Sequence, residues 1–551
     1  MTTAAAARHE AGPPLREIAY APVDIACERR LNGELLLSSR DPLGDYEQSV
    51  ARMFRDAVDR APNRTFVAER TPDGGWRKLT YAEARKQADA VAQAFIDRGL
   101  SAERPPMVLS GNSIDHAVLM LAAFTAGIPI APVSVAYSLQ SQDHAKLKFI
   151  ADLLTPGLVY VSDTGPFAKA LAALDRPDLE IVASANGGAL PRVTSFAQLA
   201  ATQVTDAVEH AVAATYGDTL AKFLFTSGST GLPKGVINTH RMLTSNQQAV
   251  VQTWPFLQDD ELVLVDWLPW NHTFAGNHNF NLVMRTAGTL YLDAGKPLPD
   301  LVKETVRNLT EISPTIYLSV PAGYAALLPH LEQNEVLARS FFRKLRLIFY
   351  AGAALPQDLW ERLDAIALRT TGQRIPMTSS WGSTETAPMA TAGHFLLERA
   401  GNIGVPAPGT DIKLVPTGDK LEVRVRGPNV TPGYWRQPEL TAAAFDEEGF
   451  YRIGDAMRFA DPDDPNRGLM FDGRLAEDFK LTTGTFVHPG PLRIGVLAAA
   501  SPALQDAIVA GDGRDCVCLL AWLSAAGCQK LVGSSEPQSL AEFAAHPRVR
   551  E

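Results

Sequence analysis

The segment from Phe223 to His240, read as FLFTSGSTGLPKGVINTH, constrains the fold of this chain more than any other stretch. It opens with an apolar run, Phe223 to Phe225, which predicts the end of a buried strand. Glycine and hydroxyl residues then crowd into a short loop, and Lys234 follows them. Because glycine has no Cβ, the backbone N–H groups of such a loop can approach an anion closely. The segment therefore predicts a site for a polyphosphate.

The loop is not a Walker A motif, because Pro233 precedes the lysine and Gly235 follows it. It resembles instead the phosphate loop of adenylate-forming enzymes, a superfamily of acyl-CoA synthetases, luciferases and peptide-synthetase adenylation domains. A Gly/Ser/Thr-rich linker is the alternative, but linkers rarely follow a strand-like run and end on Pro-Lys-Gly. The resemblance implies that ATP phosphates are held by Thr226, Ser227, Gly228, Ser229, Thr230, Gly231 and Lys234, with Thr226 and Lys234 also catalytic.

Composition limits the classes of protein that remain. A length of 551 residues predicts at least two domains. The formal net charge of −10 argues against a general binder of nucleic acid or of membrane surfaces. Four cysteines in this length form no disulfide framework, and Cys516-Val517-Cys518 lacks a second ligand pair for zinc, so reduced thiols are expected. With no signal peptide in evidence, we expect a cytoplasmic protein.

The order of apolar segments predicts an α/β fold. Strand-like and helical patterns alternate from Pro106 to Tyr160, which indicates a parallel sheet covered by helices. The stretch from Ala117 to Pro132 is interpreted as a buried helix followed by a strand, not as a membrane span. Thr80 and Glu83 have the spacing of a capping box, so a helix should run from there to about Arg98. Further buried strands are expected at Leu262 to Leu268, Met284 to Tyr291, Thr315 to Leu318 and Leu345 to Tyr350.

The resemblance implies a division into two domains. Residues 1–471 would form a large N-terminal domain that binds AMP and the acyl substrate. It would contain two flavodoxin-like α/β sheets and a small β-barrel subdomain. Residues 472–551 would form a small α+β lid domain, apparently truncated, with its hinge at Asp472.

Two further segments match the adenine-binding parts of the superfamily. Tyr350 to Pro356 predicts a strand that turns into a helix, and the resemblance places adenine against Gly352, Ala353 and Ala354. On its own this segment is weak evidence, because Gly-Ala turns are common. Thr378 to Thr386, read as TSSWGSTET, matches the pattern aromatic-Gly-x-Thr-Glu. By resemblance Trp381, where the family usually has tyrosine, stacks on adenine beside Gly382, Thr384 bonds the α-phosphate and Glu385 holds Mg²⁺.

The segments after residue 445 suggest a ribose site and a hinge. Asp455 closes the run Gly449 to Asp455, and a carboxylate there could accept hydrogen bonds from both ribose hydroxyls. A loop-capping aspartate is the alternative reading of an isolated Gly-Asp pair. In the superfamily, the residues matching Asp472, Arg474 and Lys480 act as the pivot, as a contact to ribose and phosphate, and as a lysine turned inward for thioester formation.

The acid would bind near the segment that follows the strand expected at Leu262 to Leu268. By resemblance His272 lies near the acyl group, where it could donate to the substrate carboxylate or gate the thiol path. A lone histidine is otherwise more often a satisfied core residue. Aromatic and polar side chains could wall a flat pocket, although aromatics near buried strands are often plain core. The candidate substrate-binding residues are Trp270, His272, Phe274, Tyr317, Tyr350 and Ser379.

Several strings are most similar to those of feruloyl-CoA synthetases, for example Val265 to Phe280 and Gly473 to Val487. The resemblance implies ATP- and Mg²⁺-dependent ligation of ferulic, p-coumaric or caffeic acid to CoA, as in the degradation of lignin-derived phenylpropanoids. A ligase for benzoic or medium-chain acids is the second hypothesis. A nucleotide- or acyl-AMP-binding protein with weak turnover is the third. Its partners would be small molecules, with no nucleic acid or membrane, and a homodimer is possible.

One departure from the superfamily concerns adenylation. Past Lys480 the sequence offers only Lys530, without the Gly-Lys context of the lysine that stabilises developing charge in that step. We therefore expect adenylation to be weakened and the transfer from acyl-AMP to CoA to be better preserved. Acid-dependent pyrophosphate release at the rate of a full-length relative would contradict this expectation.

Overall fold

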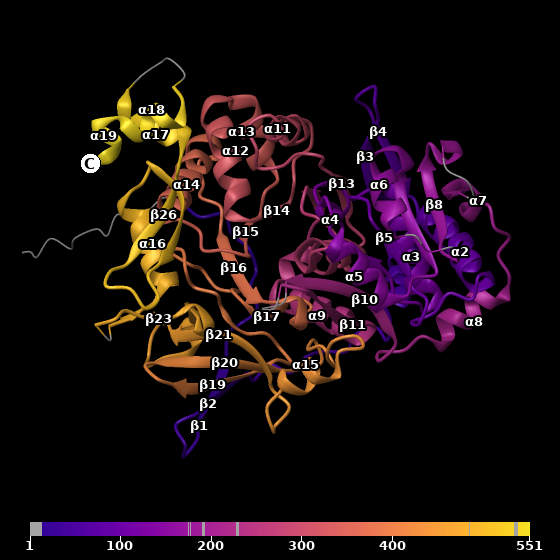
Figure 1. The fold of residues 1–551 in the computed structure, drawn as a ribbon, viewed down its shortest axis with the longest axis horizontal. Coiled ribbons are helices and arrows are strands. Elements are labelled where there is room, and N and C mark those ends of the chain that lie inside the picture. The colour runs from indigo at the N-terminus through magenta and orange to yellow at the C-terminus, as the bar shows by residue number, and fades with distance from the viewer. Residues whose placement is uncertain are drawn as a thin grey trace, which may run out of the picture.

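The structure is a computed structural model, and it describes residues 14–174, 176, 178–189, 193–227, 231–483, 485–533 and 538–551. Strands and helices alternate through most of the chain, and antiparallel strands and a small C-terminal part complete it (Figure 1). The predicted α/β class is confirmed. The division at Asp472 stays a prediction.

The first sheet consists of five parallel strands in the order β6-β5-β7-β8-β9. Its strands are β5 (Pro106–Val108), β6 (Ala131–Pro132), β7 (Leu158–Asp163), β8 (Glu180–Ala185) and β9 (Val193–Ser195). The helices of this region are α3 (Ile114–Ala126), α4 (Val135–Leu139), α5 (Ala145–Leu154), α6 (Thr164–Leu174), α7 (Phe196–Ala200) and α8 (Asp206–Ala214). The predicted helix and strand between Ala117 and Pro132 are α3 and β6, which Gly127 separates with a φ of 66°.

Two further sheets adjoin each other, since Thr315 N donates to Val263 O at 3.0 Å. One has the order β12-β13-β3-β4, and the other has the order β14-β15-β16-β17-β18. The first of these sheets contains β3 (Thr65–Arg70), β4 (Trp76–Thr80), β12 (Val263–Asp266) and β13 (Thr289–Leu292). The other sheet contains β14 (Ile316–Ser319), β15 (Leu347–Tyr350), β16 (Met377–Gly382), β17 (Met389–Ala392) and β18 (Val405–Pro406). Helices around them are α1 (Val50–Arg60), α2 (Tyr81–Asp97), α9 (His240–Thr253), α10 (Phe280–Thr286), α11 (Val302–Glu311), α12 (Pro321–Gln333), α13 (Glu335–Arg343) and α14 (Gln357–Thr371).

A six-stranded antiparallel sheet brings the two ends of the N-terminal region together in the order β1-β2-β19-β20-β21-β22. It lies at the lower edge of the molecule in Figure 1, with α15 (Pro438–Ala443) beside it. Its strands are β1 (Ile25–Arg29), β2 (Leu35–Ser39), β19 (Asp411–Thr417), β20 (Lys420–Arg426), β21 (Tyr451–Phe459) and β22 (Leu469–Arg474). This sheet corresponds to the small β subdomain expected from the sequence.

Within its described residues, the C-terminal part contains two short hairpins and four α-helices, drawn at the yellow end of Figure 1. The hairpins pair β23 (Phe479–Lys480) with β24 (Phe486–Val487) and β25 (Leu504–Ala510) with β26 (Cys518–Leu523). The helices are α16 (Pro489–Ala499), α17 (Ala525–Val532), α18 (Leu540–Ala545) and α19 (Pro547–Arg550).

A helix start that neighbouring side chains define was predicted correctly, whereas a strand predicted from an apolar run alone was not. Thr80 and Glu83 form both bonds of the predicted capping box, and α2 ends at Asp97. The strand predicted from Met284 to Tyr291 is wrong, because Met284 lies in α10 and β13 begins only at Thr289. Ala287 ends that helix in the left-handed region, with a φ of 52°. A short apolar run does not by itself distinguish a helix end from a strand.

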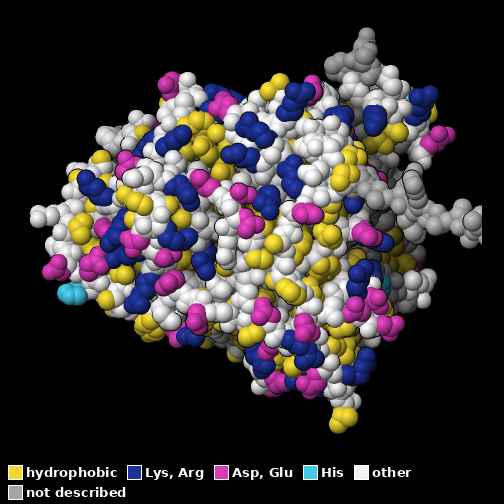
Figure 2. All heavy atoms as spheres, turned by 180° about the vertical axis from the view of Figure 1, so that it is seen from behind, with side chains coloured by type: hydrophobic (Ala, Val, Ile, Leu, Met, Phe, Trp, Pro, Cys, Tyr) yellow, Lys and Arg dark blue, Asp and Glu magenta, His cyan; other side chains and the backbone are white. Residues whose placement is uncertain are grey.

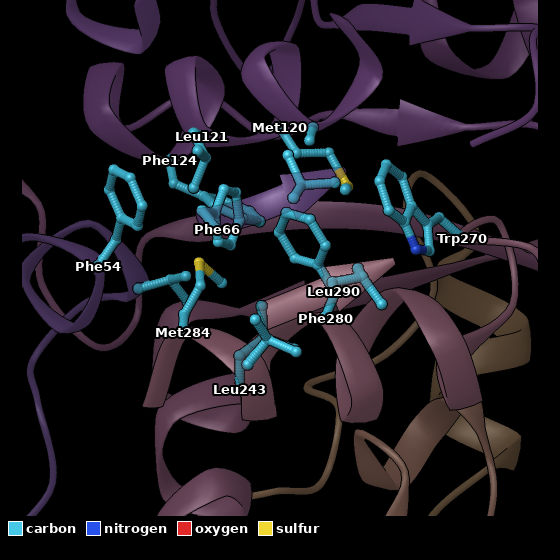
Figure 3. Packing of buried hydrophobic residues seen from close by; sticks show 14 of the residues in the cluster. Phe54, Phe66, Met120, Leu121, Phe124, Leu243, Trp270, Phe280, Met284 and Leu290 are labelled. Atoms are coloured by element: carbon cyan, nitrogen blue, oxygen red, sulfur yellow. The ribbon is translucent and has the colours of Figure 1, made fainter. Parts of the chain in front are cut away.

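The largest hydrophobic core lies between α1, α2 and α3 on one side and β3, β13, α9 and α10 on the other. Figure 3 shows Phe54, Phe66, Phe124 and Phe280 within this core. Phe66 is fully buried, with ring centroids 5.6 Å from Phe54, 5.0 Å from Tyr81 and 5.7 Å from Phe280. Residues from distant parts of the sequence thus fix the sheets that carry the site.

On the face shown in Figure 2, acidic and basic side chains are interspersed. No helix in the described ranges is long and apolar enough to cross a bilayer.

Replacing Phe66 with alanine should lower the free energy of unfolding by about 3–5 kcal/mol, because the side chain is fully enclosed and leaves a cavity. Urea denaturation followed by tryptophan fluorescence measures the loss. The control is Leu31→Ala, because Leu31 is fully exposed at 110% and its removal should change stability by less than about 0.5 kcal/mol. Equal denaturation midpoints for the two variants would contradict the placement of this core.

Candidate active site

The candidate site lies where three parallel strands end side by side. β14, β15 and β16 pair in parallel, so their carboxyl ends reach the same edge of the sheet at Ser319, Tyr350 and Gly382. In open α/β sheets, ligands bind outside the carboxyl ends of the strands. Ser379 Oγ donates to Tyr350 O at 2.8 Å and so ties two of these strands together. The predicted residue Ser379 is thus buried at the edge with its hydroxyl already engaged.

The turn after β15 presents bare backbone at this edge. Gly352, Ala353 and Ala354 are exposed, and Gly352 has a φ of 83°, a conformation that favours glycine. Such a turn offers a flat surface free of bulky side chains. Its role toward an adenine base stays a prediction.

Beside the turn, Trp381 holds Asp455 in a buried hydrogen bond. Trp381 Nε1 donates to Asp455 Oδ2 at 2.9 Å, and both residues are buried. Arg474 lies opposite Asp455 in the pairing of β21 with β22, with its Nε 3.5 Å from Asp455 Oδ1. Burial raises the pKa of Asp455, while Trp381 and Arg474 oppose that rise and the charges of Glu477 and Glu385 add to it. The carboxylate therefore has one oxygen fixed and the other beside an exposed guanidinium.

Glu385 is a second buried carboxylate in the same neighbourhood. It lies in the 3₁₀ turn Thr384–Thr386 after β16, and it is 7% exposed. Tyr434 OH donates to Glu385 Oε1 at 3.2 Å, and the hydroxyls of Tyr434 and Tyr451 are 3.2 Å apart. Lys234 Nζ lies 5.2 Å from the centre of the Tyr434 ring, a cation–π contact. Tyr434 thus connects Glu385 with Lys234, the residue that follows the glycine-rich loop.

The glycine-rich loop joins two antiparallel strands, β10 (Leu220–Ser227) and β11 (Pro233–Thr239). Thr226 pairs with Lys234 and Ser227 pairs with Pro233, so the loop is the tip of a hairpin. Gly231 has a φ of 84°. Three predicted phosphate-binding residues, Gly228, Ser229 and Thr230, lie outside the described residues, as does the side chain of Ser227.

The carboxylate of Glu385 has the chemistry to anchor a hard cation. Tyr434 OH donates to its Oε1, and Mg²⁺ commonly keeps waters and phosphate oxygens beside one or two carboxylates. Where the chain is described, no cluster of three or more His, Cys, Asp or Glu side chains could hold a metal by itself. The residues present therefore fit a cation shared with a bound phosphate and do not form a closed metal cage.

The segment after β12 forms a π-helical turn, η3 (Phe274–Asn279), that continues into α10. His272 precedes it, remains exposed, and accepts from Phe274 N at its Nδ1 over 3.3 Å. Desolvation by the surrounding chain lowers the pKa of His272, so the imidazole is neutral at pH 7. π-Helical turns are rare and are frequent at functional sites. Sequence periodicity gave no indication of this turn.

Polar side chains buried beneath the turn were also missed by the sequence analysis. Asn279 Nδ2 donates to Asp266 Oδ2, and Asn277 Nδ2 donates to Asn238 Oδ1, both over 2.8 Å. Burial raises the pKa of Asp266 to about 7, while its bonds from Asn279 and Leu268 N oppose the rise. The charged Asp266 at the end of the apolar run Leu262 to Val265 was the available signal.

His278 lies within aromatic surroundings on this turn. Its ring stacks on Phe349 with centroids 5.7 Å apart and planes 10° apart, and Phe274 and Trp254 lie at 6.1 and 6.3 Å. Since Asn279 Nδ2 donates to Asp266, Asn279 Oδ1 faces His278 Nδ1 at 3.0 Å and accepts a hydrogen bond from its N–H. Nε2 therefore carries the lone pair, and it has no partner within the described part of the chain. Burial lowers the pKa of His278 to about 4, so this acceptor is unprotonated at neutral pH.

The other predicted aromatic residues occupy different surroundings. Trp270 is 1% exposed, and its ring centroid lies 5.1 Å from that of His116 and 4.9 Å from that of Phe280. Figure 3 shows Trp270 beside Phe280. Tyr317 packs against Tyr324 and Phe341 at 5.6 and 5.1 Å in a second core cluster. Tyr350 is 2% exposed, and its hydroxyl accepts from Gly401 N at 3.3 Å. The contacts of all three are those of core residues, and their roles toward a substrate stay predictions.

The predicted hinge and lid residues lie beyond this cluster. Asp472 is on β22, and Lys480 is exposed on β23 with its carbonyl accepting from Gly513 N at 2.9 Å. Lys420 Nζ pairs with Asp478 Oδ2 at 2.6 Å, which ties the segment before Lys480 to β20. The structure thus gathers Lys234, Glu385, Trp381, Asp455 and Arg474 around one edge and leaves Lys480 in the C-terminal part.

The chain is similar to known proteins in sequence and in fold. The profile of the AMP-binding enzyme family matches residues 54–435. A long-chain-fatty-acid–CoA ligase of Escherichia coli O6:H1 is 27% identical over 514 residues, which cover 84% of this chain and 85% of the relative. A feruloyl-CoA synthase of an Amycolatopsis species is 27% identical over 535 residues, which cover 90% of this chain and 94% of the relative. A benzoate CoA ligase from Burkholderia xenovorans LB400 has the same fold, with a TM-score of 0.69, 22% identity, and coverage of 87% of this chain and 89% of its own.

Replacing Asn279 with leucine should change how stability depends on pH. The folded-state pKa of Asp266 is about 7, above its ordinary value of 3.8, so its ionisation opposes folding as pH rises through that window. Loss of the Asn279 donor raises this pKa further. The wild type should therefore level off as the pH rises above about 7, whereas the variant should keep losing stability up to pH 8.5, approaching about 1.4 kcal/mol per pH unit. Urea unfolding across pH 6–8.5 measures it.

The matched control is the double variant Asp266→Asn with Asn279→Leu, which lacks the titrating group and should show no added slope. An added slope that persists in the double variant would assign the effect to another residue.

Proposed function

The chain belongs to the AMP-binding enzyme family, and on this premise we propose that it is an AMP-forming acid–CoA ligase acting on hydroxycinnamic acids. The acid, ATP and CoA would give the aryl-CoA thioester, AMP and pyrophosphate. Support for ligase chemistry comes from relatives named as CoA ligases and matched along most of their length. Ferulic, p-coumaric and caffeic acids are the proposed substrates.

The environment of His278 is the observation that favours a hydroxylated aromatic acid. Phe274, Phe349 and Trp254 offer flat apolar faces around the imidazole. Buried Nε2 is an unpartnered acceptor, and a phenol hydroxyl is a donor of matching chemistry. An aliphatic chain would leave this acceptor unpaired, and an unpaired buried polar group costs about 1–3 kcal/mol.

The nucleotide would lie along the edge of β15 and β16. Gly352, Ala353 and Ala354 are proposed to contact adenine, with Trp381 and Gly382 beside it. Asp455 would accept from the ribose hydroxyls, and Arg474 would lie near ribose and the α-phosphate. The hairpin loop from Thr226 to Lys234 would hold the outer phosphates, with Thr384 toward the α-phosphate.

In the first half-reaction a carboxylate oxygen attacks the α-phosphorus, and the bond to pyrophosphate breaks. The chain needs no nucleophile of its own, so its contribution is position and charge. Lys234, held over the Tyr434 ring, neutralises charge on the phosphates. Glu385, fixed by Tyr434, would hold Mg²⁺, which supplies further positive charge when bound.

In the second half-reaction the CoA thiol attacks the acyl carbonyl, the thiol loses its proton, and AMP leaves. His272 is neutral and exposed at the entrance of the turn, where it can orient the acyl group or the thiol. The segment carrying Lys480 is proposed to rotate about Asp472 between the two steps.

A ligase for benzoic or fatty acids is the second candidate. The long-chain ligase of E. coli and the feruloyl-CoA synthase of Amycolatopsis are equally distant from this chain, at 27% identity. A protein that binds nucleotide or acyl-AMP with weak turnover is the third. Product formation separates it from both ligases.

A panel of acids tests the proposal. With ATP, Mg²⁺ and CoA, p-coumarate and ferulate should exceed cinnamate, benzoate and octanoate at least tenfold in kcat/KM, because only the first two carry the phenol donor. Thioester absorbance and pyrophosphate release are measured together. In His278→Leu the advantage of p-coumarate over cinnamate should fall below about threefold, with cinnamate as the internal control. Preference for octanoate would overturn the acid class, and binding without any product would overturn the ligase.

Trp381→Phe tests the proposed ribose site. The substitution keeps an aromatic ring and removes the donor to Asp455, so the already raised pKa of Asp455 should rise further. The ionised carboxylate is the form that accepts hydrogen bonds from ribose. When the solution is acidified, the variant should therefore lose AMP affinity at a higher pH than the wild type does. Titration calorimetry with AMP from pH 5.5 to 8.5 measures the midpoint.

The control is Trp76→Phe, which removes an indole bond to Glu311, 3.3 Å long, at the molecular surface. It should leave the midpoint unchanged. A midpoint that is the same in wild type and Trp381→Phe would contradict the role of Asp455.

A further inference from the structure

Lys222 is a buried lysine that the reaction described above does not use. It lies on β10 and has no exposed surface. Within the described ranges no carboxylate pairs with it, and burial lowers its pKa to about 7. Its nearest aromatic rings are Phe124 and Phe280, whose centres are 5.4 and 5.8 Å from Nζ. A buried amine without a counter-charge costs free energy, so its presence requires a reason.

The hydrogen bond of Lys222 supplies that reason. Its Nζ donates to the backbone oxygen of Gly276, in the middle of the π-helical turn η3. Gly276 cannot carry a side chain, since a Cβ there would lie 2.1 Å from Trp270 O. The turn therefore packs closely against the backbone of Trp270, and Lys222 donates to the carbonyl oxygen of Gly276.

Two neighbouring side chains bond to the next residues of the same turn. Asn238 is the cross-strand partner of Lys222 in the β10–β11 hairpin, and its Oδ1 accepts from Asn277 Nδ2 at 2.8 Å. Gln247 Nε2 on α9 reaches the carbonyls of Asn277 and His278 at 3.3 and 3.2 Å. Consecutive residues 276, 277 and 278 are thus each bonded by a side chain from outside the turn.

The geometry of a π-helical turn explains why these bonds are needed. When hydrogen bonding returns from the i→i+5 pattern to the i→i+4 pattern of α10, one backbone carbonyl is skipped. A buried carbonyl without a donor is unfavourable, and side chains can satisfy it. Lys222 and Gln247 bring side-chain donors to three consecutive carbonyls of this turn, so their hydrogen bonds stabilise it in its present shape.

We propose that Lys222 is a positioning residue that holds the turn carrying Phe274 and His278 in the shape that receives the acid. The proposal rests on the proposed function for the identity of that ligand. A regular helix from Phe274 onward would rotate these two side chains relative to Trp254 and Phe349. Lys222 acts through the Gly276 carbonyl and does not itself touch the substrate.

Lys222→Met tests the proposal, because methionine has nearly the same length and lacks the donor. Hydrogen–deuterium exchange of residues 272–281 should become faster, while exchange elsewhere in the sheets stays as in the wild type. The KM for p-coumarate should rise about tenfold and the KM for ATP should change less than twofold. The thermal midpoint should be unchanged or higher, since a buried amine has been replaced by an apolar chain. Lys169→Met, on the exposed surface of α6, should match the wild type in every measurement.

The outcomes separate the two proposals. Unchanged exchange in residues 272–281 together with an unchanged KM for the acid would overturn the role of Lys222. A lower thermal midpoint with faster exchange throughout the sheets would also overturn it, in favour of simple core filling. If the methionine variant does not fold, Lys222→Gln decides, because it keeps an N–H donor: retained protection of the turn supports the role, and loss of protection across the sheets overturns it. A wild type that makes no thioester counts against the proposed function alone, since the exchange measurement needs no turnover.

Discussion

The pairing of β11 with the segment around Tyr434 is the contact on which the site depends. Trp435 N donates to Gly235 O at 2.7 Å, and Ile237 N donates to Gly433 O at 3.1 Å. These bonds join two parts of the chain about 200 residues apart in sequence. They place Tyr434 between Lys234 and Glu385. The Tyr434 ring contacts the ammonium group of Lys234, and its hydroxyl donates to the buried carboxylate of Glu385. Without this pairing the loop would be an isolated hairpin tip.

Buried polar groups determine the rest of the site. Asp455 accepts a hydrogen bond from Trp381, and Asp266 accepts from Asn279 and from Leu268 N, and both carboxyl groups are buried. Such groups lower stability compared with apolar packing, but they allow few alternative arrangements. The turn beneath His272 shows the same principle in its backbone, where Lys222 and Gln247 bond to carbonyls. Rigidity at these points positions the groups proposed to meet the acid and the nucleotide.

Much of the fold and part of the site could be predicted from the sequence. The capping box of α2, the helix and strand between Ala117 and Pro132, and the α/β class followed from local patterns that neighbouring residues decide. The segments around Lys234, Glu385 and Asp455 were identified by their resemblance to the motifs of adenylate-forming enzymes, and the structure gathers them. The strand predicted from Met284 was wrong because an apolar run fits a buried helix end equally well. The roles of the individual site residues stay predictions.

The sequence by itself determined the family. The glycine-rich loop and the segments after it are contiguous motifs, and they can be identified without knowledge of their tertiary contacts. It could not determine which side chains surround the acid. Trp270 and Tyr317 belong to core clusters, while His278 and Lys222, which no motif singled out, lie at the π-helical turn. The physical reason is that burial and hydrogen bonding of these residues depend on strands and helices that approach from distant parts of the chain. Only the tertiary structure brings β10, α9 and β12 together beneath one turn, and so only it decides which buried polar groups have a hydrogen-bond partner within the described residues.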